Sequence, residues 1–147
     1  MRHRYAMRVR FGDTDPAKIV FYPRYFVWFH DAFETIFETA VGVPYATVLD
    51  RWRVGYPCVQ TACEYKRPAR FGELLEIEVF LSRLGERSAT FEYRVRRGEE
   101  LVATASIKVV GMDMDRHVPV PLPEPVRTAF APYVEEDAER PETHRIR

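Results

Sequence analysis

The chain has 147 residues, of which 46% are hydrophobic and 30% charged, which suits one globular domain with its own core and excludes a disordered chain. Lysine plus arginine and aspartate plus glutamate number 22 each, so the charge balance favours neither nucleic acid nor an anionic membrane as a partner. A local basic patch for a small polyanionic ligand stays compatible with this balance.

The N-terminus and the cysteines predict a cytoplasmic protein. The first eleven residues alternate apolar and mostly charged side chains and lack the apolar core of a secretory signal. No run approaches the roughly 18 apolar residues that a membrane span needs. Cys58 and Cys63 would point to opposite faces of one strand and could not bridge each other, as expected in a reducing compartment.

The first predicted element is a strand over residues 4–11, where large apolar side chains alternate mostly with arginines. Residues 12–18 contain Gly, two Asp and Pro and read as a turn. From Tyr22 to residue 40, mostly aromatic side chains recur at steps of three and four, which predicts one long buried helix. Pro23 suits its first turn, and Gly42 ends it.

Residues 43–56 read as irregular, and four alternating runs follow that predict strands over 58–66, 74–84, 88–96 and 100–112. The short turns between the last three indicate antiparallel hairpins. A Pro-rich stretch leads to a short helix predicted over residues 126–134. We therefore expect a single domain over residues 1–135 and a flexible C-terminal tail over residues 136–147, which are poor in apolar side chains.

These elements predict an α+β fold in which a five-stranded, mostly antiparallel sheet wraps around one long central helix. The inner face of the sheet is apolar. The outer face is rich in Glu and Arg but also carries Phe80 and Val102, a pattern that fits partial burial in an oligomer.

Several familiar catalytic motifs are absent, namely the nucleophile elbow, the P-loop, the dinucleotide fingerprint and the zinc-binding HExxH motif. The spacing of the four histidines suits no metal site. We therefore predict neither a metal nor a cofactor.

Asp13 and Asp15 stand directly before the aromatic helix. Free backbone N–H groups at a helix start can stabilise a carbonyl oxygen that gains negative charge, and a carboxylate held beside them could attack that carbonyl or activate water. Both aspartates could equally be ordinary turn formers, with Asp15 followed by Pro16 as a common loop dipeptide.

The run from Asp13 to Trp28, DTDPAKIVFYPRYFVW, resembles the signature of the 4-hydroxybenzoyl-CoA thioesterase family of the Pseudomonas type, which has the hot-dog fold. The dense match covers about eighteen residues including those just before Asp13, and the order of elements agrees from Tyr5 to Met112. The resemblance implies an acyl-CoA thioesterase for an aromatic or short acyl group. Coenzyme A would enter as part of the substrate.

The resemblance also implies roles for individual residues. Asp15 corresponds to the catalytic nucleophile or general base, and the backbone N–H of Tyr22 to the donor that polarises the thioester carbonyl. Asp13 and Pro16 would shape the loop. Substrate-binding positions are expected at Tyr25, Trp28 and His30, and CoA-binding positions at Arg87, Arg67 and Arg70.

Two departures from the family pattern concern Lys18, which stands where the family usually has Gly, and the turn at Leu84–Arg87, which lacks the family's aromatic and its dense basic cluster. They bear on the loop conformation and on the 4-hydroxybenzoyl and CoA specificity.

Two alternative functions are compatible with the same fold. One is an enoyl-thioester hydratase or dehydratase, for which His30 on the helix would be the partner of an aspartate. The other is a non-catalytic acyl-CoA binding protein. In each case the resemblance implies edge-to-edge pairing of sheets, with a homodimer as the minimal active unit and a homotetramer as the expected assembly.

Overall fold

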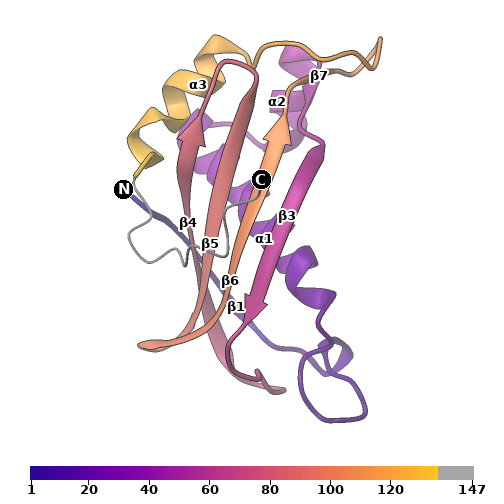
Figure 1. Ribbon diagram of the computed structural model, residues 1–147, viewed down its shortest axis with the longest axis vertical. Coiled ribbons are helices and arrows are strands. Elements are labelled where there is room, and N and C mark those ends of the chain that lie inside the picture. Colours follow the sequence, from indigo (N-terminus) through magenta and orange to yellow (C-terminus); the bar gives the residue numbers. More distant parts are fainter. Residues whose placement is uncertain (136–147) are drawn as a thin grey trace.

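The computed structural model describes residues 1–135, so the predicted tail over residues 136–147 lies outside the described residues. Five strands form an antiparallel sheet in the order β1-β4-β5-β6-β3 (Figure 1). They are β1 (His3–Arg8), β3 (Cys58–Tyr65), β4 (Leu74–Leu84), β5 (Ser88–Arg97) and β6 (Glu100–Val110). As predicted, tight turns join β4 to β5 and β5 to β6, which leaves β1 and β3 as the two edges.

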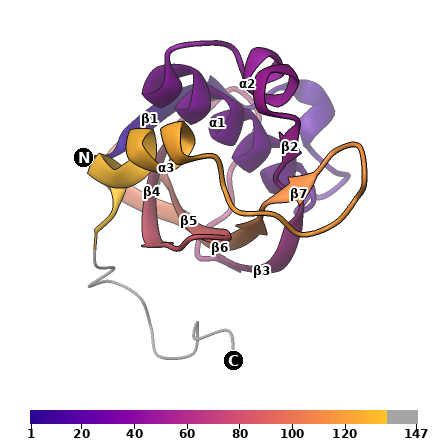
Figure 2. The same ribbon diagram turned by 90° about the horizontal axis from the view of Figure 1, so that it is seen from above.

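The helix α1 (Arg24–Val41) lies against one face of this sheet, and the view from above shows the sheet curving around it (Figure 2). Seven of its side chains are buried: Tyr25, Trp28, Phe29, Ala32, Phe33, Ile36 and Phe37. Four of these, at 25, 29, 33 and 37, belong to the predicted stripe, whereas Phe26 and Ala40 of that stripe are only partly buried and Tyr22 is exposed. The ring of Phe29 lies 4.9 Å from that of Tyr93 on β5, and the ring of Phe33 lies 5.1 Å from that of Phe91. The predicted hot-dog architecture is confirmed.

The ends of the first two elements differ from the prediction. β1 stops at Arg8, and the following residues form a 3-10 turn, η1 (Phe11–Asp13), instead of continuing the strand to residue 11. The helix α1 begins at Arg24 because Pro23 is its N-cap, which places Tyr22 in the turn before the helix. It ends as predicted, at Gly42 with a φ of 88°.

The prediction that residues 43–56 are irregular was wrong, since they contain α2 (Tyr45–Trp52) and the short strand β2 (Val54–Gly55). The signal was present, because apolar side chains at 45, 48, 49 and 52 have helical spacing. The helix has only eight residues, so the pattern covers about two turns and is a weak signal.

Further differences lie at the C-terminal end of the described chain. β6 stops at Val110 instead of residue 112. The next residue is Gly111, where a Cβ would lie 2.4 Å from the carbonyl oxygen of Val120. The chain then forms β7 (Met112–Asp113), which pairs with β2. The last helix is α3 (Glu124–Phe130), followed by a 3-10 turn, η2 (Ala131–Tyr133), where one helix over 126–134 was predicted.

The outer face of the sheet contains buried charged groups. Glu78 is 6% exposed and accepts hydrogen bonds from Arg2 at 3.1 Å and from Arg96 at 2.5 Å. The guanidinium carbon of Arg2 also lies 4.2 Å from the centre of the Phe80 ring. Buried charges persist in proteins when they are paired in this way.

No helix among residues 1–135 combines the length and the apolar character that crossing a bilayer demands.

Candidate active site

A closed loop over residues 13–21 joins η1 to the turn before α1. The N–H of Phe21 donates to the carbonyl of Asp13 at 2.8 Å, and the N–H of Asp15 donates to the carbonyl of Ile19 at 2.9 Å. An isolated antiparallel bridge lies between these two hydrogen bonds. The backbone of the loop is therefore held on both sides.

The side chain of Asp13 ties the two ends of this loop together. It is 3% exposed and accepts a hydrogen bond from the backbone N–H of Arg10 at 2.8 Å. Its other oxygen accepts from Nε of Arg24 at 2.9 Å and lies 2.8 Å from Nη2 of the same residue. Asp13 thus connects the end of β1 to the first residue of α1.

Asp15 lies at the tip of the loop and is half-buried. Its Oδ1 accepts a hydrogen bond from the N–H of Ala17 at 2.8 Å across the exposed Pro16, so the side chain has a fixed orientation. Its Oδ2 has no hydrogen-bond partner within residues 1–135. One carboxylate oxygen is therefore held in place while the other is available to a substrate or a water molecule.

Lys18 has a backbone conformation that favours glycine, the residue that the resemblance led us to expect at this position. Its φ is 67°, which is the left-handed region that glycine adopts without steric penalty. Its N–H donates to the carbonyl of Asp15 at 2.8 Å, so the loop closes despite the side chain.

Tyr22 supplies a free donor at the helix start. The neighbouring N–H groups are occupied, because that of Phe21 bonds Asp13 and that of Arg24 donates to the carbonyl of Phe21 at 2.9 Å. Pro23 has no N–H. Within the described part of the chain the N–H of Tyr22 donates to no acceptor, which is what a carbonyl-polarising group requires.

An open groove of about 690 Å³ runs beside this loop and is lined by Tyr22, Tyr25 and the segment from Tyr65 to Ala69. The hydroxyl of Tyr65 donates to the carbonyl of Tyr22 at 3.3 Å, and its ring lies 5.1 Å from that of Tyr25. Burial raises the pKa of Tyr25 to about 12, so its hydroxyl stays protonated well above neutral pH. Asp15 itself lies next to the groove, bonded to the lining residue Ile19.

A family model described as the thioesterase-like superfamily matches residues 9–130. The chain belongs to this superfamily. Among its relatives, a 1,4-dihydroxy-2-naphthoyl-CoA hydrolase of Synechococcus elongatus is 32% identical over 117 residues, which cover 79% of this chain and 85% of the relative. The acyl-CoA thioesterase YbgC of Haemophilus influenzae is 27% identical over 126 residues, 86% of this chain and 92% of the relative.

Solved structures of other thioesterases share the fold. A gentisyl-coenzyme A thioesterase superposes with a TM-score of 0.79 at 33% identity, covering 88% of this chain and all of that chain. A 4-hydroxybenzoyl-CoA thioesterase superposes with a TM-score of 0.80 at 23% identity, covering 88% and 99%, a likeness that shows the fold alone. The prediction of a thioester hydrolase is thus confirmed at the level of the superfamily, whereas the 4-hydroxybenzoyl type is not singled out.

The three arginines predicted to bind CoA occupy different parts of this thioesterase-like domain. Arg67 lines the groove, and its side chain is 62% exposed. Its loop is held next to the Asp15 loop, because the N–H of Val20 donates a hydrogen bond to the carbonyl of Ala69 at 2.8 Å. Arg70 is exposed on the same loop but does not line the groove. Arg87 lies in the turn between β4 and β5, at the opposite end of the sheet (Figure 1).

The three residues of α1 that were predicted to bind the substrate also lie in different places. Tyr25 lines the groove, but Trp28 is 4% exposed, packs 5.0 Å from Tyr25 and lines neither the groove nor the second cavity described below. His30 lines that second cavity, and its Nε2 lies 3.7 Å from Glu34. The structure therefore does not bring His30 to the Asp15 loop within one chain.

Tyr65 and Lys66 are groove residues that the sequence reasoning missed. They end a strand with ordinary alternation, and only the sheet order brings them to the turn before α1. A short aromatic and basic run, YKR at residues 65–67, was the available signal.

Proposed function

We propose that this chain is an acyl-CoA thioesterase that hydrolyses an aromatic acyl-CoA, with Asp15 as the catalytic carboxylate and the N–H of Tyr22 as the carbonyl-polarising donor. The observation that carries the proposal is the closed loop over residues 13–21, which holds a carboxylate with one free oxygen at its tip and leaves one free N–H just beyond its end.

The chemistry follows from these two groups. The thioester oxygen would accept the hydrogen bond from Tyr22 as negative charge develops on it. As general base, Asp15 takes a proton from water, and the resulting hydroxide adds to the carbonyl carbon. The C–S bond then breaks, and the proton returns from Asp15 to the leaving thiolate to give the acid and the CoA thiol. As nucleophile, a carboxylate oxygen of Asp15 adds to the carbonyl carbon and expels the CoA thiolate, which takes a proton from water, and a water molecule then hydrolyses the mixed anhydride to regenerate Asp15 and release the acid.

The aromatic substrate class is supported from two sides. Relatives of this chain are described as hydrolases of dihydroxynaphthoyl-CoA and gentisyl-coenzyme A. The groove has aromatic walls, and Lys66 and Arg67 give it basic groups that suit the phosphates of coenzyme A.

The proposed assembly is a homodimer, with a homotetramer as the complete form, in the cytoplasm. β3 is an open edge of the sheet on which only Glu64 is charged, and its Val59 is 51% exposed. Such an edge is a template for pairing with another strand. Pairing of β3 with the same strand of a second subunit would extend the sheet and place the groove at the interface.

The test is release of free thiol from benzoyl-, hydroxybenzoyl-, phenylacetyl- and short-chain acyl-CoAs by the native protein and by Asp15→Asn. We expect turnover on an aromatic class and a loss of about 10²–10⁴-fold in kcat for the variant, with an unchanged thermal midpoint. Turnover by Asp15→Asn at the native rate, or none by the native protein, would contradict the proposal.

A further inference from the structure

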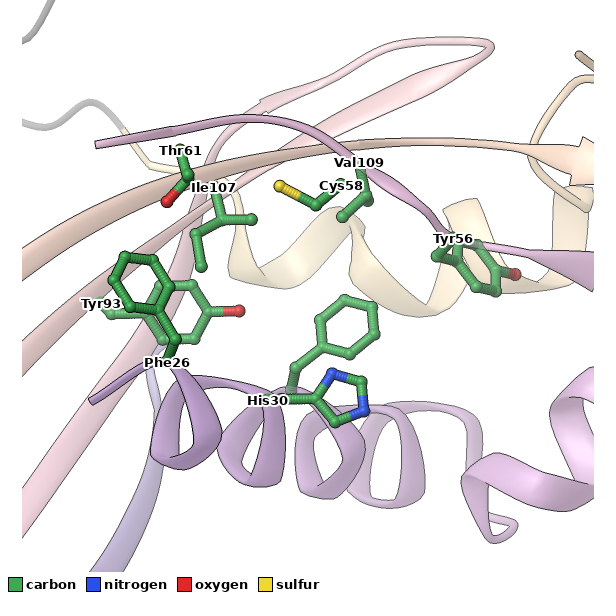
Figure 3. Close-up of a pocket in the computed structure, with 9 residues that line it drawn as sticks. Phe26, His30, Tyr56, Cys58, Thr61, Tyr93, Ile107 and Val109 are labelled. Carbon is green, nitrogen blue, oxygen red and sulfur yellow. The ribbon is translucent and has the colours of Figure 1, made fainter. Parts of the chain in front are cut away.

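A second cavity, of about 320 Å³, lies between α1 and the part of the sheet that ends at β3 (Figure 3). We call this cavity the chamber. Its walls come from α1, β3, β5, β6 and the segment before β3, and they are mostly apolar. A volume of this order and an apolar lining are typical of a site for a small ligand.

The hydroxyl of Tyr93 is a polar group that faces the chamber from β5. Tyr93 is 1% exposed, and its ring packs 4.9 Å from that of Phe29. Figure 3 shows its hydroxyl directed into the chamber, toward the space between Ile107 and His30. Among the residues that the structure describes, this hydroxyl has no hydrogen-bond partner.

A hydroxyl that faces a cavity takes its hydrogen-bond partner from there, either water or a polar group of a ligand. Burial raises the pKa of Tyr93, so the hydroxyl is protonated at neutral pH and can donate as well as accept. A hydroxyl group on a ligand satisfies both of these capacities.

The position of the chamber suits the acyl end of the proposed substrate. Phe26, its first residue on α1, is four residues beyond Tyr22, which lies in the turn before the helix, so the two are at most roughly 14 Å apart. A carbonyl bound at Tyr22 would therefore have the chamber on the side toward which α1 runs.

Tyr56 provides a contrast within the same chamber. Its hydroxyl is also buried without a partner in the described residues, but Figure 3 shows it directed away from the other lining side chains. Both residues present a ring to the chamber, and only Tyr93 also presents its hydroxyl.

We propose that Tyr93 is a specificity-determining residue, whose hydroxyl hydrogen-bonds a hydroxyl substituent on the aromatic acyl group held in the chamber. This inference rests on the proposed function, and it narrows the substrate class from aromatic acyl-CoAs to hydroxylated ones. Sites that hydrogen-bond a substrate hydroxyl discriminate strongly against the analogue without it, because a buried polar group is then left unpaired.

The test uses two matched pairs, 4-hydroxybenzoyl-CoA with benzoyl-CoA and 4-hydroxyphenylacetyl-CoA with phenylacetyl-CoA. We expect the native protein to prefer the hydroxylated member of at least one pair by tenfold or more in kcat/KM. Tyr93→Phe should reduce that ratio to within about threefold of unity, mainly by slowing cleavage of the hydroxylated substrate. Tyr133→Phe, at a buried tyrosine outside the chamber, should keep the ratio, and so should Tyr56→Phe.

Binding of the same pairs to Asp15→Asn, with and without Tyr93→Phe, is measured by calorimetry, so that the result does not depend on hydrolysis. A hydroxyl preference that disappears with Tyr93→Phe supports the assignment even if the native protein cleaves neither thioester, an outcome that would overturn only the hydrolytic function. Equal binding of both members of each pair, or a preference unchanged by Tyr93→Phe, would overturn the assignment of Tyr93.

Discussion

The carboxylate of Asp13 and the guanidinium of Arg24 form a partly buried ion pair, 2.8 Å apart, that links the loop carrying Asp15 to the first residue of α1. The pair fixes the loop relative to the helix, and with it the position of the proposed catalytic carboxylate relative to the N–H of Tyr22. The acidic partner is 4% exposed and the basic partner 42%.

Arg24→Met should lower the free energy of unfolding by about 1–3 kcal/mol, because the buried Asp13 would lose its charged partner. Activity should fall at least tenfold, since small displacements of a catalytic group slow a reaction strongly. Arg4→Met is the matched control, because it removes an ion pair to Glu76 that is exposed on both sides and should change stability by less than about 1 kcal/mol. Urea unfolding of both variants checks this, and equal effects would contradict the structural role of the pair.

Lys18→Gly should raise stability by about 0.5–1 kcal/mol, because it removes a side chain from a residue with a φ of 67°. Lys18→Ala is the control, since alanine keeps the Cβ that causes the strain and should give no such gain. Thermal unfolding at one pH distinguishes them. A gain of the same size with alanine would assign the effect to the lost charge instead.

Stability should fall at acid pH in a way that depends on Glu78. Burial alone would raise the pKa of Glu78, but its hydrogen bonds and charge interactions with Arg96 and Arg2 outweigh this and lower it below the ordinary value of 4.5. A lowered pKa in the folded state stabilises the protein above the unfolded-state value, and this contribution is lost as pH falls through the folded-state value.

Unfolding in urea between pH 7 and pH 3 should therefore show a shallower acid decline for Glu78→Gln than for the native protein, together with a lower stability at pH 7. Glu76→Gln, on the same face of β4 but with a carboxylate that is 41% exposed, is the comparison and should follow the native profile. Parallel profiles for all three proteins would show that Glu78 contributes nothing to the acid limb.

Arg67→Ala should raise KM for an acyl-CoA by roughly threefold to tenfold and leave kcat unchanged, because Arg67 borders the groove but not the Asp15 loop. The corresponding acyl-pantetheine, which lacks the nucleotide phosphates, should show no change in KM. Arg87→Ala is the comparison variant, because Arg87 lies at the other end of the sheet from the groove. An equal effect of Arg87→Ala would place the nucleotide across two subunits.

Val59→Lys should convert a dimer to a monomer, because it puts a charge on the open edge strand that we propose to pair between subunits. Val118→Lys is the control, since Val118 is similarly exposed, at 44%, but lies outside the sheet. Light scattering after size-exclusion chromatography gives the mass of each variant. A native protein that is monomeric and active would contradict the proposed minimal unit.

The elements of this fold could largely be predicted from the sequence. β4 was predicted with its observed ends, and α1 with four of its seven buried side chains, because side-chain alternation and three-to-four spacing report directly on which face is buried. α2 was missed although its apolar side chains have helical spacing, because the helix is only eight residues long. Gly111 follows β6 at a point where the chain approaches Val120 too closely for a Cβ, a contact that side-chain alternation does not predict.

The same distinction holds for the site. The sequence alone predicted that Asp13 and Asp15 lie in a turn directly before an aromatic helix that begins near Tyr22, since turn residues and helix starts are local features. The folded chain was needed to show that Tyr65 contacts Tyr22, 43 residues away, that Trp28 is core and that Tyr93 directs a hydroxyl into the chamber. These contacts depend on strand order and on how the sheet packs against α1, because both are set by pairing between segments far apart in the chain.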